Sequence, residues 1–291
     1  MLTRPAMRSR PADALRETGI ILRDDLLTAL RSFLGIAALV LYAAMNLAVA
    51  LPYLKISALL EGKLAEQETT ARVAMAVGGK AAWLKLFQFL ADDDAQAAQA
   101  MLDVPLQAIF IFTMAAFFVP LVSIIVSHDI IAEDLRSGHI RFLSVRCRRG
   151  SLVVGRLLAR SALMAAVIVI VGVGTFCLMA VRGDGLPHGA WLHFARYTAL
   201  LAGMAPCYVG LAGLISTLVR SPFVALVLSL SALFGLVILG FASDQLGWIA
   251  PSYHKGLLYA PGTWPRGIAA YLAFAGGFGA LAWLRLKTRD L

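Results

Sequence analysis

Residues 104–127 of the chain, VPLQAIFIFTMAAFFVPLVSIIVS, contain no charged side chain. A helix needs about 20 mostly apolar residues to cross the hydrocarbon core of a membrane, and this stretch satisfies that length. Other stretches of similar length also lack charge, which is typical of a multi-pass membrane protein. The six predicted spans are 32–54, 104–127, 161–181, 197–219, 221–243 and 267–284. We therefore expect an all-α membrane protein with six transmembrane helices.

The composition of the whole chain agrees with this class. Of the 291 residues, 60% are hydrophobic and only 15% are charged, against about 25% charged in a typical soluble domain. The net charge of +9 does not indicate nucleic-acid binding, because the basic residues flank the apolar stretches and form no single basic surface. Cys147, Cys177 and Cys207 show no Cys-x-x-Cys spacing, so we expect no metal site and no disulfide framework.

The distribution of lysine and arginine predicts the orientation of the spans. If the N-terminus is cytoplasmic, the cytoplasmic segments are 1–31, 128–160, Arg220 and 285–291. These segments hold 17 of the 26 basic residues, as expected if cytoplasmic loops carry the excess of positive charge. We therefore place both termini in the cytoplasm and the protein in the plasma (inner) membrane.

Residues 1–31 are predicted to contain a cytosolic amphipathic helix that leads into the first span. Leu15, Leu22 and Leu26 lie close to one helical face, whereas charged residues such as Asp25 are largely off it. A helix of this pattern is expected to lie along the inner membrane surface.

Two segments are predicted to lie on the outer side. The outer insert, residues 55–103, has apolar residues at helical spacing, which predicts an amphipathic helix over the outer leaflet or the spans. These residues are Trp83, Leu86, Phe87 and Leu90. Residues 243–267 mix aromatic residues with prolines, which predicts a broken interfacial re-entry with an aromatic belt. The belt residues are Trp248, Tyr253, Tyr259 and Trp264.

The most informative connection is residues 128–160, HDIIAEDLRSGHIRFLSVRCRRGSLVVGRLLAR, which is too charged to lie in lipid. A short helix is predicted to begin at Ser127 or His128 and to end at Gly138, because glycine readily adopts the left-handed conformation that follows helix ends. Its acidic residues would be repelled by an anionic inner leaflet, so they indicate a partner other than lipid. A groove on another protein would suit its apolar residues. Those residues are Ile130, Ile131 and Leu135.

Arginines surround the second half of this connection, and we name them the basic collar. They can act as a topology signal and contact lipid headgroups. Ser151 is the predicted N-cap of the third span. Arg156 and Arg160, at i and i+4, are expected to share one face at the level of the inner headgroups. The basic collar consists of Arg146, Arg148, Arg149, Arg156 and Arg160.

The order Asp129-Ile-Ile-Ala-Glu133-Asp-Leu-Arg136-Ser-Gly138, followed by arginines and then Gly155-Arg156, resembles the cytoplasmic loop of type-2 ABC transporter permeases. That family carries an Asp…Glu-Arg…Gly-Thr…Leu-Leu…Pro-x-Ser-Arg…Gly-Lys pattern between its second and third spans. Here Asp134 stands in place of the family Arg, and Arg156 in place of the Lys. The layout of the rest of the chain is also similar to that of the family.

The resemblance implies that residues 129–143 act as a coupling helix, which docks in a cleft of a separate ATPase subunit and transmits its closure to the spans. The coupling residues would be Asp129, Ile130, Ile131, Glu133, Asp134, Leu135, Arg136, Gly138, Arg141 and Phe142. It further implies an exporter that works as a homodimer or with a related permease. ATP and magnesium would be bound by the partner ATPase, and this chain would bind no cofactor.

The motifs of catalysis are missing from the sequence, so we do not expect an enzyme. Gly150–Leu157 has the glycine spacing of a P-loop but lacks its Lys and Ser/Thr, and no Gly-x-Ser-x-Gly nucleophile motif occurs. The spans are nearly free of carboxylates, which disfavours a proton-driven transporter. An alternative function is a non-transporting membrane scaffold or immunity-type protein that binds lipid or a partner. The sequence does not select a substrate.

Overall fold

The computed structural model describes residues 11–31, 35–48, 50–51, 106–182, 190–242, 248–259 and 263–288, with five further positions between 84 and 99. Within this part of the chain the secondary structure is helical, and no β-strand occurs. The elements are α1 (Pro11–Arg31), the helical segment Gly35–Ala48, α5 (Leu106–Ser127), α6 (Ala132–Ser137), α7 (His139–Arg146), α8 (Arg149–Arg182), α9 (Ala190–Leu218), α10 (Pro222–Ala242), the 3-10 helix η1 (Pro251–Leu258) and α12 (Trp264–Thr288).

Five of these helices are long and apolar enough to cross a membrane, namely α5, α8, α9, α10 and α12. A sixth candidate span consists of α1 and Gly35–Ala48 taken together, which meet at a bend of 64°. The predicted all-α membrane class is therefore confirmed. The first predicted span, 32–54, is described only in part, and the count of six spans stays a prediction.

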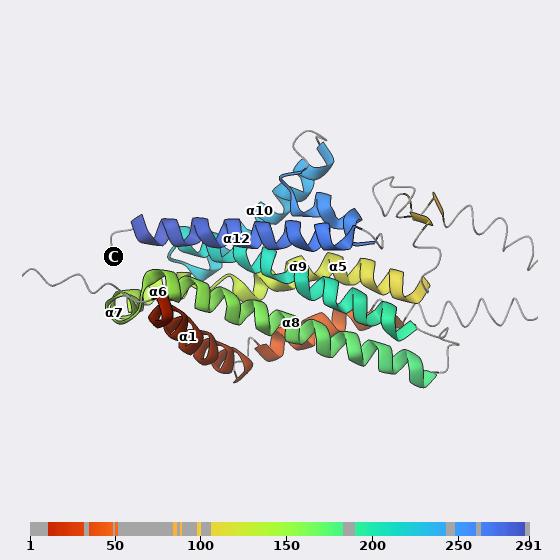
Figure 1. Ribbon diagram of the computed structural model, residues 1–291, viewed down its shortest axis with the longest axis horizontal. Helices are drawn as coiled ribbons and strands as arrows, with labels where there is room; N and C mark the ends of the chain where they lie inside the picture. Colours follow the sequence, from red (N-terminus) through yellow and green to blue (C-terminus); the bar gives the residue numbers. More distant parts are fainter. Residues whose placement is uncertain are drawn as a thin grey trace, which may run out of the picture.

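Helix α9 is the central helix of the bundle. It packs against α12, α8 and α5, which run beside it along the long axis of the molecule (Figure 1). Most α9 side chains from Tyr197 onward are buried in the common apolar core. Helix α10 lies at the periphery and exposes large apolar side chains such as Phe223 and Ile238. Such exposure suits lipid or another apolar surface, since it is unfavourable in water.

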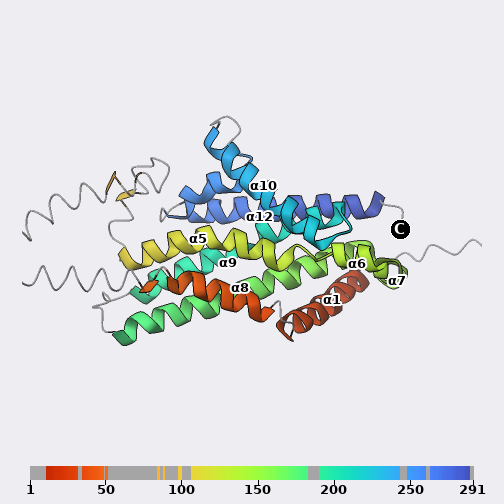
Figure 2. The same cartoon turned by 180° about the vertical axis from the view of Figure 1, so that it is seen from behind.

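Helices α1, α6 and α7 gather at one end of the bundle, next to the C-terminal end of α12 (Figures 1 and 2). We call this end the polar end and the opposite one the distal end. The arrangement is compatible with the prediction that the N-terminal helix, the second connection and the C-terminal tail share one side of a membrane.

Helix α8 begins earlier than the predicted third span, which was placed at 161–181. It starts at Arg149 and has 34 residues, so at 1.5 Å per residue it is about 51 Å long. A hydrocarbon core is only about 30 Å thick, so α8 is longer than a span requires, and its charged first turns at the polar end are the part least suited to lipid. The predicted N-cap at Ser151 is wrong. This residue lies inside α8, and its hydroxyl donates a hydrogen bond of 3.3 Å to the carbonyl oxygen of Ala14.

Of the two predictions for the outer side, the one for the outer insert cannot be compared with the described residues, and the one for the aromatic belt is confirmed only in part. Most of the outer insert, including the amphipathic helix predicted near Trp83, lies outside the described residues. In the predicted aromatic belt, Trp248, Tyr253 and Trp264 are exposed, but Tyr259 is only 1% exposed. Its hydroxyl lies 2.9 Å from the Thr113 hydroxyl inside the bundle, so Tyr259 is a core residue.

Candidate functional site

Helix α6 is capped by a side chain from another helix. Ser216 of α9 is buried, and its hydroxyl oxygen accepts hydrogen bonds from the backbone N–H groups of Ile131 (2.9 Å) and Ala132 (2.7 Å). The first N–H groups of a helix have no partner within it, so Ser216 performs the role of an N-cap from a distance. The helix begins at Ala132, later than predicted, whereas its predicted end at Gly138 (φ +73°) is confirmed.

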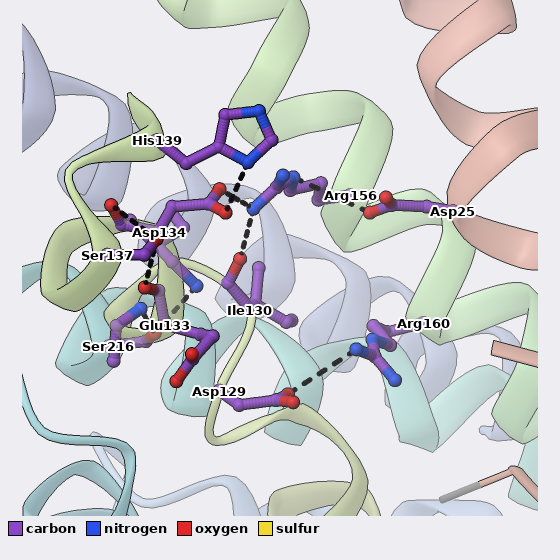
Figure 3. Close-up of polar contacts among 12 residues, drawn as sticks. Asp25, Asp129, Ile130, Glu133, Asp134, Ser137, His139, Arg156, Arg160 and Ser216 are labelled. Carbon is purple, nitrogen blue, oxygen red and sulfur yellow. Dashed lines mark hydrogen bonds and ion pairs between the residues drawn. The ribbon is translucent and has the colours of Figure 1, made fainter. Parts of the chain in front are cut away.

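Arg156 of α8 connects three helices at the polar end (Figure 3). Its guanidinium pairs with Asp134 of α6, lies 3.6 Å from the carboxylate of Asp25 on α1, and donates a hydrogen bond of 2.6 Å to the carbonyl oxygen of Ile130. The side chain is only 14% exposed. Charge-assisted contacts are strengthened when they are shielded from water, so this one residue joins α1, α6 and α8 firmly.

A second arginine, one helical turn further along α8, holds the turn that precedes α6. The Arg160 guanidinium donates to Asp129 over 3.4 Å, and its side chain is also mostly buried. His139 of α7 lies 3.9 Å from the other oxygen of the Asp134 carboxylate. We name the joined groups the polar clamp. The polar clamp consists of Asp25, Asp129, Asp134, Arg156, Arg160 and Ser216.

Helix α1 packs tightly against the start of α8. Gly155 allows this approach, because a Cβ atom there would lie 2.8 Å from Cγ2 of Ile21. The Glu17 carboxylate accepts a hydrogen bond of 3.3 Å from the backbone N–H of Arg148, just before α8, where the helix dipole favours negative charge. Burial raises the pKa of the Asp25 carboxyl, and the neighbouring Arg156 charge opposes this effect.

The buried face of α1 agrees with the predicted one only in part: Leu26 packs against the core and Leu22 is half-buried. Asp25, expected off the apolar face, points at α8, whereas Leu15 is 75% exposed. The location of α1 along the inner membrane surface stays a prediction.

The arginines of the basic collar have separate roles in this structure. Arg149 donates hydrogen bonds to the carbonyl oxygens of Leu286 (3.0 Å) and Lys287 (3.1 Å), where a cation is favourable at the C-terminal end of α12. Arg156 and Arg160 belong to the polar clamp, so these two do not form the headgroup-facing pair that we expected. The side chain of Arg146 lies outside the described residues, and lipid contact by the collar stays a prediction.

The predicted docking residues divide into a buried and an exposed group. Ile130, Ile131 and Leu135 are at most 9% exposed and belong to the core of this chain, so the expectation that they project toward a partner is wrong. All three are apolar, and their burial in the common core removes them from water. The outward residues are Glu133 and Arg136, paired at 2.7 Å, and Phe142, which is 74% exposed.

We call Glu133, Arg136 and Phe142 the exposed face of α6–α7. The side chain of Arg141, a further predicted docking residue, lies outside the described residues. The exposed face of α6–α7 lies at the surface of the polar end. Behind it, the polar clamp connects α6 to three long helices, α1, α8 and α9.

Sequence reasoning missed Ser216 and the contact made by Asp25. Ser216 precedes Thr217 near the end of an otherwise apolar stretch, which is a weak signal. Asp25 lies four residues from both Ile21 and Ala29, so helical spacing places it on the face that these residues bury. That spacing is the signal by which it could have been found.

A comparison with protein families matches residues 20–249 to the model described as ABC-2 family transporter protein. The match covers well over half of the chain and includes α6, α7 and the whole polar clamp. No curated protein matches the chain.

Proposed function

The chain belongs to the ABC-2 family of transporter proteins, and from this premise we propose that it is the permease subunit of an ATP-driven exporter. A separate ATPase subunit would bind ATP and magnesium and dock on the exposed face of α6–α7. The observation that carries this proposal is the polar clamp, because it links the surface proposed for docking to the helices that would have to move.

The clamp supports a defined route for the motion. A push on α6 would pass through the Asp134–Arg156 ion pair to α8, and through the Ser216 hydroxyl to α9. The contact of Arg156 with Asp25 would carry α1 along. A buried ion pair resists separation, since breaking it leaves an unpaired charge away from water, so α6 and α8 would move together.

The oligomer and the direction of transport are part of the proposal. We propose that two such subunits, or one and a related permease, form the transport path between them, with the polar end in the cytoplasm. The apolar exposed face of α10 is compatible with lipid or with a second subunit around such a path.

The docking step can be tested with Phe142→Ala in the full-length chain, co-expressed with the ABC ATPase encoded nearest to it in its genome. An exposed aromatic anchor that fills a partner pocket contributes about 2 kcal/mol or more, so co-purification of the ATPase should fall about tenfold or more. Trp191→Ala is the matched control, because Trp191 is 58% exposed but lies on α9 at the distal end. Fluorescence-detected size exclusion confirms that both variants insert.

The outcomes separate the candidate functions. If the ATPase no longer co-purifies with Phe142→Ala but still co-purifies with Trp191→Ala, the result supports docking at the exposed face of α6–α7. Co-purification of the ATPase in equal amounts with both variants contradicts docking through Phe142. Failure of any ATPase to co-purify with the wild-type chain would contradict the exporter and favour the non-transporting scaffold.

A further inference from the structure

A small cavity lies in the distal half of the bundle, away from the polar clamp. Its volume is about 30 Å³, and its walls come from Gly35–Ala48, α5, α8 and α9. Most lining residues are apolar or aromatic, among them Phe112, Val171 and Phe194. The polar lining residues all carry uncharged hydroxyl or amide groups. They are Tyr42, Asn46, Thr175, Tyr197 and Thr198.

The hydroxyl group of Tyr197 is the polar group that a ligand in this cavity could bind. The residue is only 3% exposed, and its hydroxyl has no hydrogen-bond partner among the described residues. The ring is held in place by stacking on Phe112, with 4.4 Å between the ring centroids. Buried hydroxyls in proteins nearly always have a partner, so this one is available to a bound molecule.

The neighbouring polar groups are already satisfied in part. The Thr175 hydroxyl donates to the carbonyl oxygen of Val171 over 2.8 Å, and the Asn46 side-chain amide donates to the carbonyl oxygen of Tyr42 over 2.8 Å. The Tyr197 hydroxyl differs from both groups, because no carbonyl oxygen of the described residues accepts a hydrogen bond from it.

The size and charge of the cavity restrict the ligand. A space of about 30 Å³ admits one small group, such as a hydroxyl or an amide, and excludes a whole lipophilic molecule. None of the described lining residues is Asp, Glu, Lys or Arg, so an ionised group would lose its hydration without gaining a counter-charge.

We propose that this cavity binds the uncharged hydrogen-bonding group of a lipophilic molecule, with Tyr197 as its hydrogen-bond partner. The apolar remainder of the molecule would extend out of the cavity along the helices into lipid. Helix α8 contains both Thr175 of the cavity and Arg156 of the polar clamp, so a ligand here would contact the same helix that the clamp holds. The inference concerns binding and does not require the ATPase partner.

The test uses the full-length chain in phosphatidylcholine nanodiscs, without ATPase. The probe is a 16-carbon alcohol with a photoreactive diazirine beside its hydroxyl group, and the comparison probe is the fatty acid with the same chain and diazirine. Mass spectrometry locates the labelled residues. We expect the alcohol to label lining residues of α5, α8 and α9, and the ionised acid to label them far less.

Two variants test the role of the cavity. Tyr197→Phe removes one hydroxyl and should lower labelling by the alcohol about fivefold to tenfold, the loss expected for one hydrogen bond. Tyr253→Phe, at a half-exposed tyrosine of η1, is the control and should not change labelling. Ala115→Leu places a larger side chain in the cavity and should abolish labelling of its lining residues by the alcohol. If that variant fails to fold, the change in labelling caused by Tyr197→Phe still tests the proposal.

Labelling that is spread over the lipid-facing surface, or that Tyr197→Phe leaves unchanged, would overturn the proposal. Equal labelling by the alcohol and the acid would overturn the restriction to uncharged groups. A cavity that holds only water would give no labelling of its lining residues and would overturn the proposal as well.

Discussion

At the polar end of the bundle two arginines hold three carboxylates, whereas the distal end is held by aromatic rings and hydroxyl groups. The polar end joins Asp25, Asp129 and Asp134 to Arg156 and Arg160. At the distal end the rings of Phe112 and Tyr259 pack edge to face, with 5.1 Å between their centroids. The hydroxyl groups of Thr113 and Tyr259 share a hydrogen bond of 2.9 Å.

The difference follows from where water is available. The arginines in the first turns of α8 keep a small exposed fraction, 14% for Arg156 and 16% for Arg160, so they pair without losing all contact with solvent. Inside the membrane an unpaired charge is far more costly, and neutral groups and aromatic packing take over. Charged contacts therefore lie at the polar end, where we propose that a partner docks, and neutral contacts lie at the distal end, where we propose that a lipophilic molecule binds.

The largest effect is expected from Arg156→Met. This change leaves Asp134 and Asp25 without their cation and the Ile130 carbonyl without its donor, which should destabilise the fold by about 3–5 kcal/mol. Thermal unfolding of the purified protein, followed by fluorescence-detected size exclusion, measures the change.

The matched change at the distal end is Thr113→Val, which removes one hydroxyl from a neutral pair and should cost only about 1 kcal/mol. Equal losses for Arg156→Met and Thr113→Val would show that the two ends do not differ in the strength of their contacts.

An intermediate effect is expected from Ser216→Ala. Two backbone N–H groups at the start of α6 would lose their acceptor, at a cost of about 1–2 kcal/mol. The loss should be local, so hydrogen exchange should speed up in residues 131–137 and not in α9. Ser137→Ala is the control, because its hydroxyl donates only to carbonyl oxygens within α6, those of Glu133 and Asp134, and does not hold the start of the helix. Unchanged exchange in α6 would mean that Ser216 does not hold this helix.

The smallest effect is expected from Asp25→Asn, and it depends on pH. Burial raises the pKa of Asp25 above its usual 3.8, so the folded state binds this proton more tightly than the unfolded state does. The contribution of Asp25 to stability therefore falls as the pH rises from 3.8 through the raised pKa. Relative to the wild type, Asp25→Asn should become more stable over that range in a series of melting temperatures. A difference that is constant with pH would show that Arg156 compensates the charge fully.

Much of the fold could be predicted because it depends on local composition. The uncharged stretch 104–127 coincides with α5 within two residues, and 221–243 with α10 within one residue at each end. The end of α6 at Gly138 was also predictable, since a left-handed residue is required there and glycine adopts it at little cost. The starts of α8 and α9 were not predictable in this way: α8 begins 12 residues before its predicted span and α9 begins seven residues before. Hydropathy marks only the uncharged part of a helix, and a helix can continue into a segment that contains charges.

The sequence by itself determined the class of protein, the limits of α5 and α10 and the segment on which the family resemblance rests, because charge and hydropathy act on each stretch of chain separately. Only the tertiary structure decided the partners of Arg156 and the cap provided by Ser216. It also decided the burial of Ile131 and the neutral cavity beside Tyr197. Those features join residues from different helices, and which charges and hydroxyls meet is fixed by how the helices pack.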